Sequence, residues 1–209
     1  MLKGITSDLT GASDICRPVR DLATCQAAQY LLPNEQILFS LQSIKEEFTF
    51  TNYWLIKVYG DSATTTRKLV SRAEFKHTLL EHVRFETAGR VDRDVEIKFK
   101  IGSDHISIDI ARDEELEARL YYKVLVLLSR TQEEREREWE FACLGLEQSA
   151  KALRLTEASG QTLTKQANET LQWLQETYER THPTCHRELI MGAFNTLRTT
   201  LKMEGGSVG

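Results

Sequence analysis

The sequence places three side chains that can bind metal ions close together, at His182, Cys185 and His186. Zinc in proteins takes four ligands in a tetrahedral site, or three ligands and an open position. A fourth ligand, such as Cys143, would have to come from elsewhere in the fold. The alternative is a junction between two helices, with Pro183 in the first turn of the second. We favour the junction and assign no metal site, although the sequence leaves metal binding by these three side chains open.

Histidines and carboxylates also occur together in the middle of the chain, where they could serve acid–base catalysis. His82 lies beside Glu81, but strand alternation places these two side chains on opposite faces. His77 has glutamates nearby, and Asp92 and Asp94 share a face, yet that face is the solvated one. The chain has no nucleophile elbow, phosphate-binding loop, dinucleotide-binding loop or zinc-protease motif. The sequence therefore predicts no catalytic residue, no cofactor and no enzyme.

Large aromatic side chains stand outside the main apolar stripes of the C-terminal half. Trp139 lies in the most charged run of the chain, close to Phe141, and Trp173 lies off the stripe of its own helix. Aromatic residues in such positions often anchor protein interfaces. Burial between helices of the same bundle is an equally good alternative.

The stretch from Asp113 to Arg130 is the element on which the predicted organisation depends. Leucine and valine recur in it at helical spacing, which predicts one buried stripe on a helix; these residues are Leu116, Leu120, Val124, Leu127 and Leu128. A second apolar arc leaves only a narrow polar strip, and it contains Ala118, Tyr121, Tyr122, Leu125 and Val126. We expect one side to close a sheet and the other to meet further helices or another subunit. The predicted interface residues are Tyr121, Leu125, Val126, Trp139, Phe141 and Trp173.

Before this helix, the sequence has the alternation of short β-strands. Between Ile37 and Ile110, seven runs alternate apolar and polar residues, with the clearest pair on either side of the Gly102–Asp104 turn. Strands with one apolar and one polar face indicate an antiparallel sheet that is covered on one side. We predict an α+β fold, in which a bent sheet or partly open barrel of about seven strands is capped by the helix.

The remaining segments complete the predicted domain organisation. Residues 1–30 form an N-terminal segment with a short helix, 31–130 the sheet domain and 131–209 a helical extension that frays from about 204. The extension shows helical stripes separated by the break at Ala158–Gly160 and by Pro183. Its short connections predict a helical hairpin or bundle.

Several short motifs occur at matching places around the predicted strands. They are LPNEQ at 32–36, FTFTN at 48–52, ETAG at 86–89, the GSD turn at 102–104 and the closing helix. With these motifs, the stretch from about Leu31 to Arg130 resembles the bacterial pleckstrin-homology-like (PH-like) domain family. The resemblance implies a bent antiparallel sheet of seven strands capped by a C-terminal helix. It also implies self-association, because family members tend to form rings and some carry a helical extension associated with oligomerisation.

Lipid binding is the obvious functional alternative for a PH-like domain. In eukaryotic lipid-binding members, lysines and arginines from the first two strands and their loop neutralise inositide phosphates. Here that region offers Lys45 followed by Glu46 and Glu47, although Arg67-Lys68 and Arg72 could supply a modest basic edge. Because phosphate affinity needs several charge-assisted contacts at once, we keep lipid binding only as the alternative.

The composition is that of an ordinary soluble globular protein, and we expect a cytoplasmic location by default. The 209 residues are 41% hydrophobic and 28% charged, with a net charge of −4, which gives no reason to expect nucleic acid as a partner. No apolar run approaches the roughly 18 residues of a membrane span, and the N-terminus lacks a secretory pattern. Four separated cysteines indicate reduced thiols. We predict a homo-oligomeric scaffold or interaction module, with a peripheral lipid-binding module as the alternative.

Overall fold

The computed structural model describes residues 14–60, 67–87, 94–152 and 163–205. The chain divides into two compact units, one of residues 1–129 with 184–209 and the other of residues 130–183. The boundary that we expected near Arg130 coincides with the start of the second unit. The chain from Thr184 onward differs from our expectation, because its contacts place it in the sheet unit and not in the helical extension.

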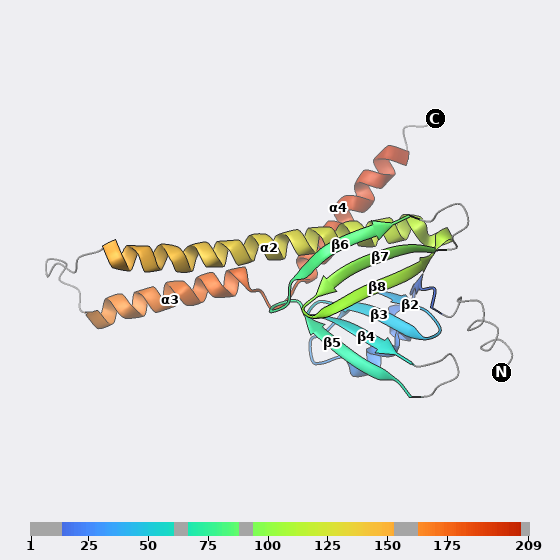
Figure 1. Ribbon diagram of the computed structural model, residues 1–209, viewed down its shortest axis with the longest axis horizontal. Coiled ribbons are helices and arrows are strands. Elements are labelled where there is room, and N and C mark those ends of the chain that lie inside the picture. The colour runs from blue at the N-terminus through green and yellow to red at the C-terminus, as the bar shows by residue number, and fades with distance from the viewer. Residues whose placement is uncertain (1–13, 61–66, 88–93, 153–162, 206–209) are drawn as a thin grey trace. The chain divides into compact units, whose positions relative to one another are not determined.

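The sheet unit has the predicted α+β architecture (Figure 1). Five antiparallel strands follow one another in chain order: β1 (Arg17–Pro18), β2 (Ile37–Gln42), β3 (Glu46–Thr51), β4 (Trp54–Tyr59) and β5 (Leu69–Glu74). A second antiparallel sheet contains β6 (Leu80–Glu86), β7 (Asp94–Ile101) and β8 (Asp104–Ala111). Together they form the open, bent arrangement of a PH-like fold, which confirms the predicted fold class.

In the second sheet, the alternation of apolar and polar residues in the sequence corresponds to alternating burial of the side chains. Along β7, Val95, Ile97, Phe99 and Ile101 are buried, while the charged residues between them are partly exposed. Side chains of a strand point to opposite faces in turn, so a single strand can line a core and face water at the same time. Gly102 has a φ of 59° in the β7–β8 turn, a conformation that glycine adopts without steric cost.

A short N-terminal segment joins the two sheets along one side. The Cys16 N–H donates to the Asp109 carbonyl at 2.7 Å, and the Ala111 N–H donates to the Cys16 carbonyl at 3.0 Å. The next residue, Arg17, is paired with Gln42 of β2. Consecutive residues therefore hydrogen-bond first to β8 and then to β2.

The first part of α2 (Glu115–Ala152) closes the core, as predicted. Buried side chains come from both of the apolar arcs that we identified, and they are Ala118, Leu120, Tyr121, Val124, Leu125 and Leu128. The predicted stripe is wrong at its first member, since Leu116 is 77% exposed, and Leu127 is exposed as well. The hydroxyl of Ser129 donates to the Leu80 carbonyl at 2.6 Å, which holds this part of the helix to β6.

Helix α4 (Arg187–Gly205) covers the second apolar side of α2 within the sheet unit. Its residues Ile190, Ala193 and Phe194 are buried in the same core as β2 and α2. The ring of Phe194 meets Phe39 at 5.4 Å and Tyr121 at 5.8 Å between centroids, edge-on in both cases. The further helix that we expected beside α2 is therefore supplied by the end of the same chain.

The predicted N-terminal helix is replaced by two 3-10 turns, η1 (Leu22–Thr24) and η2 (Gln26–Tyr30). These turns lie on the outer face of the five-stranded sheet, where Ala27 packs against Ile56 and Val58. The buried carboxylate of Glu47 accepts hydrogen bonds from the backbone N–H groups of Gln26 and Ala27 at 2.7 and 2.9 Å. This part of the sheet is thus covered on both faces, which simple alternation did not predict.

Replacing Phe194 with alanine tests whether α4 is part of the core. We expect Phe194→Ala to lower the free energy of unfolding by about 3–5 kcal/mol, because it removes a buried ring and leaves a cavity. Urea unfolding followed by circular dichroism measures this change. The control is Asn195→Ala, an exposed position on the same helix, which should change stability by less than about 0.5 kcal/mol. Equal effects of both variants would contradict the assignment.

Candidate functional site

The second unit is a helical hairpin, formed by α2 from Arg130 onward and α3 (Leu163–Thr181). An aromatic cluster joins the two helices, in which Trp139 meets Tyr178 and His182 edge-on at 5.2 and 5.8 Å between ring centroids. His182 stacks on Tyr178 at 4.3 Å, and its Nε2 lies 3.3 Å from a carboxylate oxygen of Glu136. The contact between these helices is therefore largely aromatic and polar.

The hairpin lacks an apolar core of its own among the side chains that the structure describes. Its buried residues are polar, namely Gln132, Thr177 and Thr181, and none of its described apolar side chains is buried. Large apolar residues face solvent instead, and they are Phe141, Leu144, Leu171 and Trp173. Two helices without apolar burial gain little stability from each other, because amphipathic packing supplies most of the stability of a helix.

The six predicted interface residues fall into three groups. Tyr121 and Leu125 are buried in the core of the sheet unit, and Val126 beside them is partly buried. Trp139 is partly buried by the aromatic cluster of the hairpin. Phe141 is 76% exposed and Trp173 is 46% exposed, so these two present apolar surface that a partner could cover. A subunit interface at these residues stays a prediction.

The three side chains considered as metal ligands have other contacts. His182 belongs to the hairpin, whereas Cys185 and His186 belong to the sheet unit. The Asn52 amide donates to the Cys185 sulfur at 3.7 Å, and His186 meets Phe75 edge-on at 5.8 Å. Within the described ranges, no group of three histidine, cysteine, aspartate or glutamate residues is placed to hold a metal ion. The segment does join two helices, but Pro183 lies in the connection between α3, which ends at Thr181, and α4, which begins at Arg187, and not in the first turn of the second helix.

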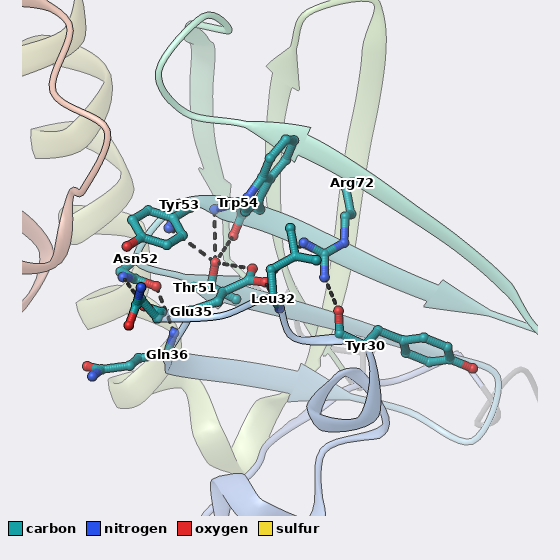
Figure 2. A network of polar contacts seen from close by, with 10 residues as sticks. Tyr30, Leu32, Glu35, Gln36, Thr51, Asn52, Tyr53, Trp54 and Arg72 are labelled. Carbon is teal, nitrogen blue, oxygen red and sulfur yellow. Dashed lines mark hydrogen bonds and ion pairs between the residues drawn. The ribbon is translucent and has the colours of Figure 1, made fainter.

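The LPNEQ and FTFTN motifs meet in a buried polar network (Figure 2). The fully buried carboxylate of Glu35 accepts from the Thr51 hydroxyl at 2.8 Å and from the Leu32 N–H at 2.9 Å. A guanidinium nitrogen of Arg72 lies 3.0 Å from the same carboxylate, and Arg72 also donates to the Tyr30 carbonyl. Every charge of the network is therefore paired, and its role is to fix the chain before β2 against β3 and β5.

Asn52, the last residue of FTFTN, forms the other half of this network. Its side-chain oxygen accepts from the Gln36 N–H at 2.7 Å, and its side-chain nitrogen donates to the Asn34 carbonyl at 3.1 Å. Its backbone carbonyl accepts from the His186 N–H at 2.8 Å. Asn34 has a φ of 66°, a left-handed conformation that asparagine tolerates better than most residues. The LPNEQ and FTFTN motifs thus have a structural role. The spacing of residues in the sequence gave no signal that Glu35 pairs with Arg72.

The loop between β2 and β3 has its charges paired within the chain. Lys45 is paired with Asp14 at 3.2 Å, and Glu46 is paired with Lys57 at 3.3 Å. Glu47, the second carboxylate after Lys45, is buried. Arg72, expected to contribute a basic edge, is held by Glu35. The charges that lipid binding would need here are already paired within the chain.

One expectation about the catalytic candidates is wrong. A β-bulge shifts the register between Glu81 and Arg84, so simple alternation fails at His82. His82 has a φ of 54° and lines a surface pocket, whereas His77 is exposed in the turn between β5 and β6. Asp94 lies in β7; Asp92 and the second half of the ETAG motif lie outside the described residues.

The outer face of the second sheet carries an acidic end around Asp109. Burial raises the pKa of Asp109 from 3.8 to about 6, and the negative charges of Glu96, Asp94, Glu46 and Asp14 raise it further in the same direction. Close by, burial raises the pKa of the Cys16 thiol to about 12. This thiol is therefore protonated at neutral pH and unsuited to act as a nucleophile. All four cysteines carry free thiols.

The family model for the bacterial PH domain matches residues 10–128, more than half of the chain. The chain belongs to the bacterial PH domain family. This assignment agrees with the two bent sheets and the closing helix, and families with this domain are generally non-enzymatic. The described residues contain no helix long and apolar enough to span a membrane.

Two similar proteins extend this comparison. A crystal structure of a PH domain-containing bacterial protein from Exiguobacterium sibiricum 255-15 is 31% identical, with a TM-score of 0.77. The match covers 87% of this chain and 100% of that one, so it extends beyond the residues of the family model. The uncharacterised protein YvbH of Bacillus subtilis (strain 168) is 36% identical over 135 residues. That match covers 63% of this chain and 66% of the relative, just under two thirds of its length.

A double-mutant cycle tests the buried pair of Glu35 and Arg72. We expect Glu35→Gln and Arg72→Met each to lower the free energy of unfolding by about 3–5 kcal/mol, because each leaves a buried charge without its partner. The double variant should be less destabilised than the sum, since it leaves no lone charge. Arg119→Met, which breaks an exposed pair with Glu115, should cost less than about 1 kcal/mol. Additive effects of the two core substitutions would show that the pair is not coupled.

Asp109→Asn tests the acidic end of the second sheet. Because the folded state raises this pKa, ionised Asp109 destabilises the fold above about pH 6, and the effect disappears below about pH 4. We expect Asp109→Asn to raise the free energy of unfolding at pH 7.5 by about 1–2 kcal/mol, a value reduced for the partial exposure of the carboxylate. Urea unfolding from pH 7.5 to 4 should show the gain shrinking with falling pH. A constant difference would indicate another cause.

Proposed function

We propose that this protein is a non-enzymatic oligomeric scaffold or interaction module. In this proposal the PH-like domain is the rigid part, and the hairpin of residues 130–183 supplies the surface for self-association. The observation that carries the proposal is the contrast between the units. The sheet unit buries one continuous apolar core, whereas the described part of the hairpin buries no apolar side chain and exposes several large ones.

The size of the hairpin supports an association surface. A pair of helices this small cannot supply a sufficient core, and natural small scaffolds often gain stability by oligomerising. Phe141 and Leu144 are three residues apart and so lie on one face of α2. Aromatic and aliphatic side chains in this arrangement serve as anchors that a partner helix can cover.

A second copy of the chain is the occupant that fits this surface. Along α2, residues 133–140 (EEREREWE) intersperse both signs of charge, so an antiparallel copy can place arginine opposite glutamate. The hairpin already uses such pairs internally, as between Arg180 and Glu138. The PH-like resemblance adds that family members tend to form rings, which are closed assemblies of repeated interfaces. We place the protein in the cytoplasm, where its four free thiols would stay reduced.

The test is the mass of the full-length protein by native mass spectrometry and light scattering. We expect the unchanged chain to be multimeric at micromolar concentration without lipid. The double variant Phe141→Ser/Leu144→Ser, and separately Trp173→Ser, should lower the mass, because each removes exposed apolar surface of the hairpin. Circular dichroism should show an intact sheet unit, since exposed substitutions seldom change folding stability by more than about 0.5 kcal/mol.

Leu116→Ser is the matched control. Leu116 is 77% exposed on the same helix but belongs to the sheet unit, so this change should leave the mass unaltered. A monomeric unchanged protein, or hairpin variants with the mass of the unchanged protein, would contradict the proposal. Truncation at Arg130 is a poor test, because it also removes Ile190 and Phe194 from the core.

A further inference from the structure

The outer face of the second sheet carries a pocket of about 360 Å³ that self-association does not explain. Basic and imidazole side chains from three neighbouring strands line it, and they are His82 and Arg84 of β6, Lys98 and Lys100 of β7, and His105 of β8. The register places Lys98 opposite Arg84 and Lys100 opposite His105, so the cationic groups adjoin one another. The side chains converge on one region of the surface.

A strained bulge brings His82 to this pocket. Three residue steps on β6, from Glu81 to Arg84, match two steps on β7, from Lys100 to Lys98, so β6 contains one extra residue. His82 adopts a φ of 54°, a conformation that costs a non-glycine residue free energy. β-Bulges of this kind change the direction of a side chain and occur often beside functional sites. The bulge at His82 is an observation independent of the basic composition.

The pocket has hydrogen-bond donors that the described residues leave unused. Lys98 is paired with Glu86 and Glu96, and Lys100 with Glu81, at 2.7 to 3.0 Å. An ammonium group has three N–H donors, so these pairs orient the lysines without exhausting them. The side chain of Arg84 makes no ion pair or hydrogen bond with any residue that the structure describes. Its guanidinium is therefore the charge of the pocket that no described carboxylate neutralises.

We propose that this pocket binds the phosphate group of a small phosphorylated ligand. A phosphate presents several acceptor oxygens at once, and arginine can bind two of them through a bidentate contact. His82, Lys98 and Lys100 lie around Arg84 and supply donors to the other oxygens. The acidic residues Glu96 and Asp109 continue the same face and confine the anion to the end at Arg84.

This site is separate from the loop between β2 and β3, where the PH-like resemblance placed inositide recognition. That loop has a single cation, Lys45, which is paired with Asp14, whereas the pocket adds Arg84 to its paired lysines. The inference does not depend on the proposed self-association, because all of its residues lie in the sheet unit.

Equilibrium dialysis of the full-length protein against radiolabelled inorganic phosphate tests the site, with chloride keeping the ionic strength constant. We expect saturable binding that Arg84→Gln weakens at least about tenfold, the loss typical of a charge-assisted contact. The matched control is Arg119→Gln, which removes the same charge from an exposed, ion-paired arginine of α2 and should bind as the unchanged protein does. Non-saturable uptake, or equal binding by both variants, overturns the proposal.

His82→Gly provides a second variant, in case Arg84→Gln alters the fold. Glycine accepts the left-handed conformation, so this change should keep or raise the melting temperature while weakening phosphate binding severalfold. A rise in melting temperature with unchanged phosphate binding would show that the bulge serves only the fold. It would overturn the role of His82 in phosphate binding.

Sedimentation with vesicles identifies the source of the phosphate. Vesicles of phosphatidylcholine with phosphatidic acid present the group on a membrane, and those of phosphatidylcholine alone lack a free phosphate monoester. Binding that depends on phosphatidic acid and on Arg84 indicates a lipid headgroup. Binding of inorganic phosphate without sedimentation indicates a soluble phosphorylated ligand. No response to either form of phosphate overturns the site.

Discussion

A cluster of four aromatic rings holds the sheet unit together. Phe50 stacks on Phe39 at 4.3 Å, Phe39 stacks on Tyr121 at 4.8 Å, and Phe194 meets the last two edge-on. These rings come from β3, β2, α2 and α4, so one contact joins strands and helices that are far apart in the sequence. Because aromatic rings bury large areas and prefer defined geometries, the cluster fixes where both helices lie on the sheets. It also explains why the end of the chain belongs to the first unit.

The polar network of Glu35, Thr51, Asn52 and Arg72 complements this apolar cluster. An apolar core gives stability but specifies the connections around it weakly, whereas a buried carboxylate tolerates few arrangements of its partners. Glu35 and Asn52 bind backbone groups of the segment that leads into β2. Glu47 fixes the 3-10 turns on the outer face by similar bonds. The LPNEQ and FTFTN motifs are therefore positions where backbone groups find partners within the chain.

The surfaces of the two units differ in the kind of partner that they suit. The hairpin exposes apolar side chains among mixed charges, which suits another helical surface. On the second sheet, β7 carries Asp94 and Glu96 toward one end and Lys98 and Lys100 toward the other, so its outer face changes sign along the strand. This gradient was present in the sequence as an alternating series. Which charges of β7 lie beside which side chains of β6 and β8 could not be read from that series. The bulge at His82 and the register between β7 and β8 decide it.

The sequence by itself determined the strands from β2 to β8, the closing helix and the fold class. These follow from short-range periodicity, since a side chain's face depends on its position within one strand or helix. The tertiary structure alone decided that α4 packs on the sheets, that Leu116 faces solvent and that Glu47 is buried. It also decided that Tyr121 lies in the core and that His82 shares a pocket with Arg84. Each of these facts depends on contacts between residues far apart in the chain or on one extra residue in a strand, and local alternation contains no information about either.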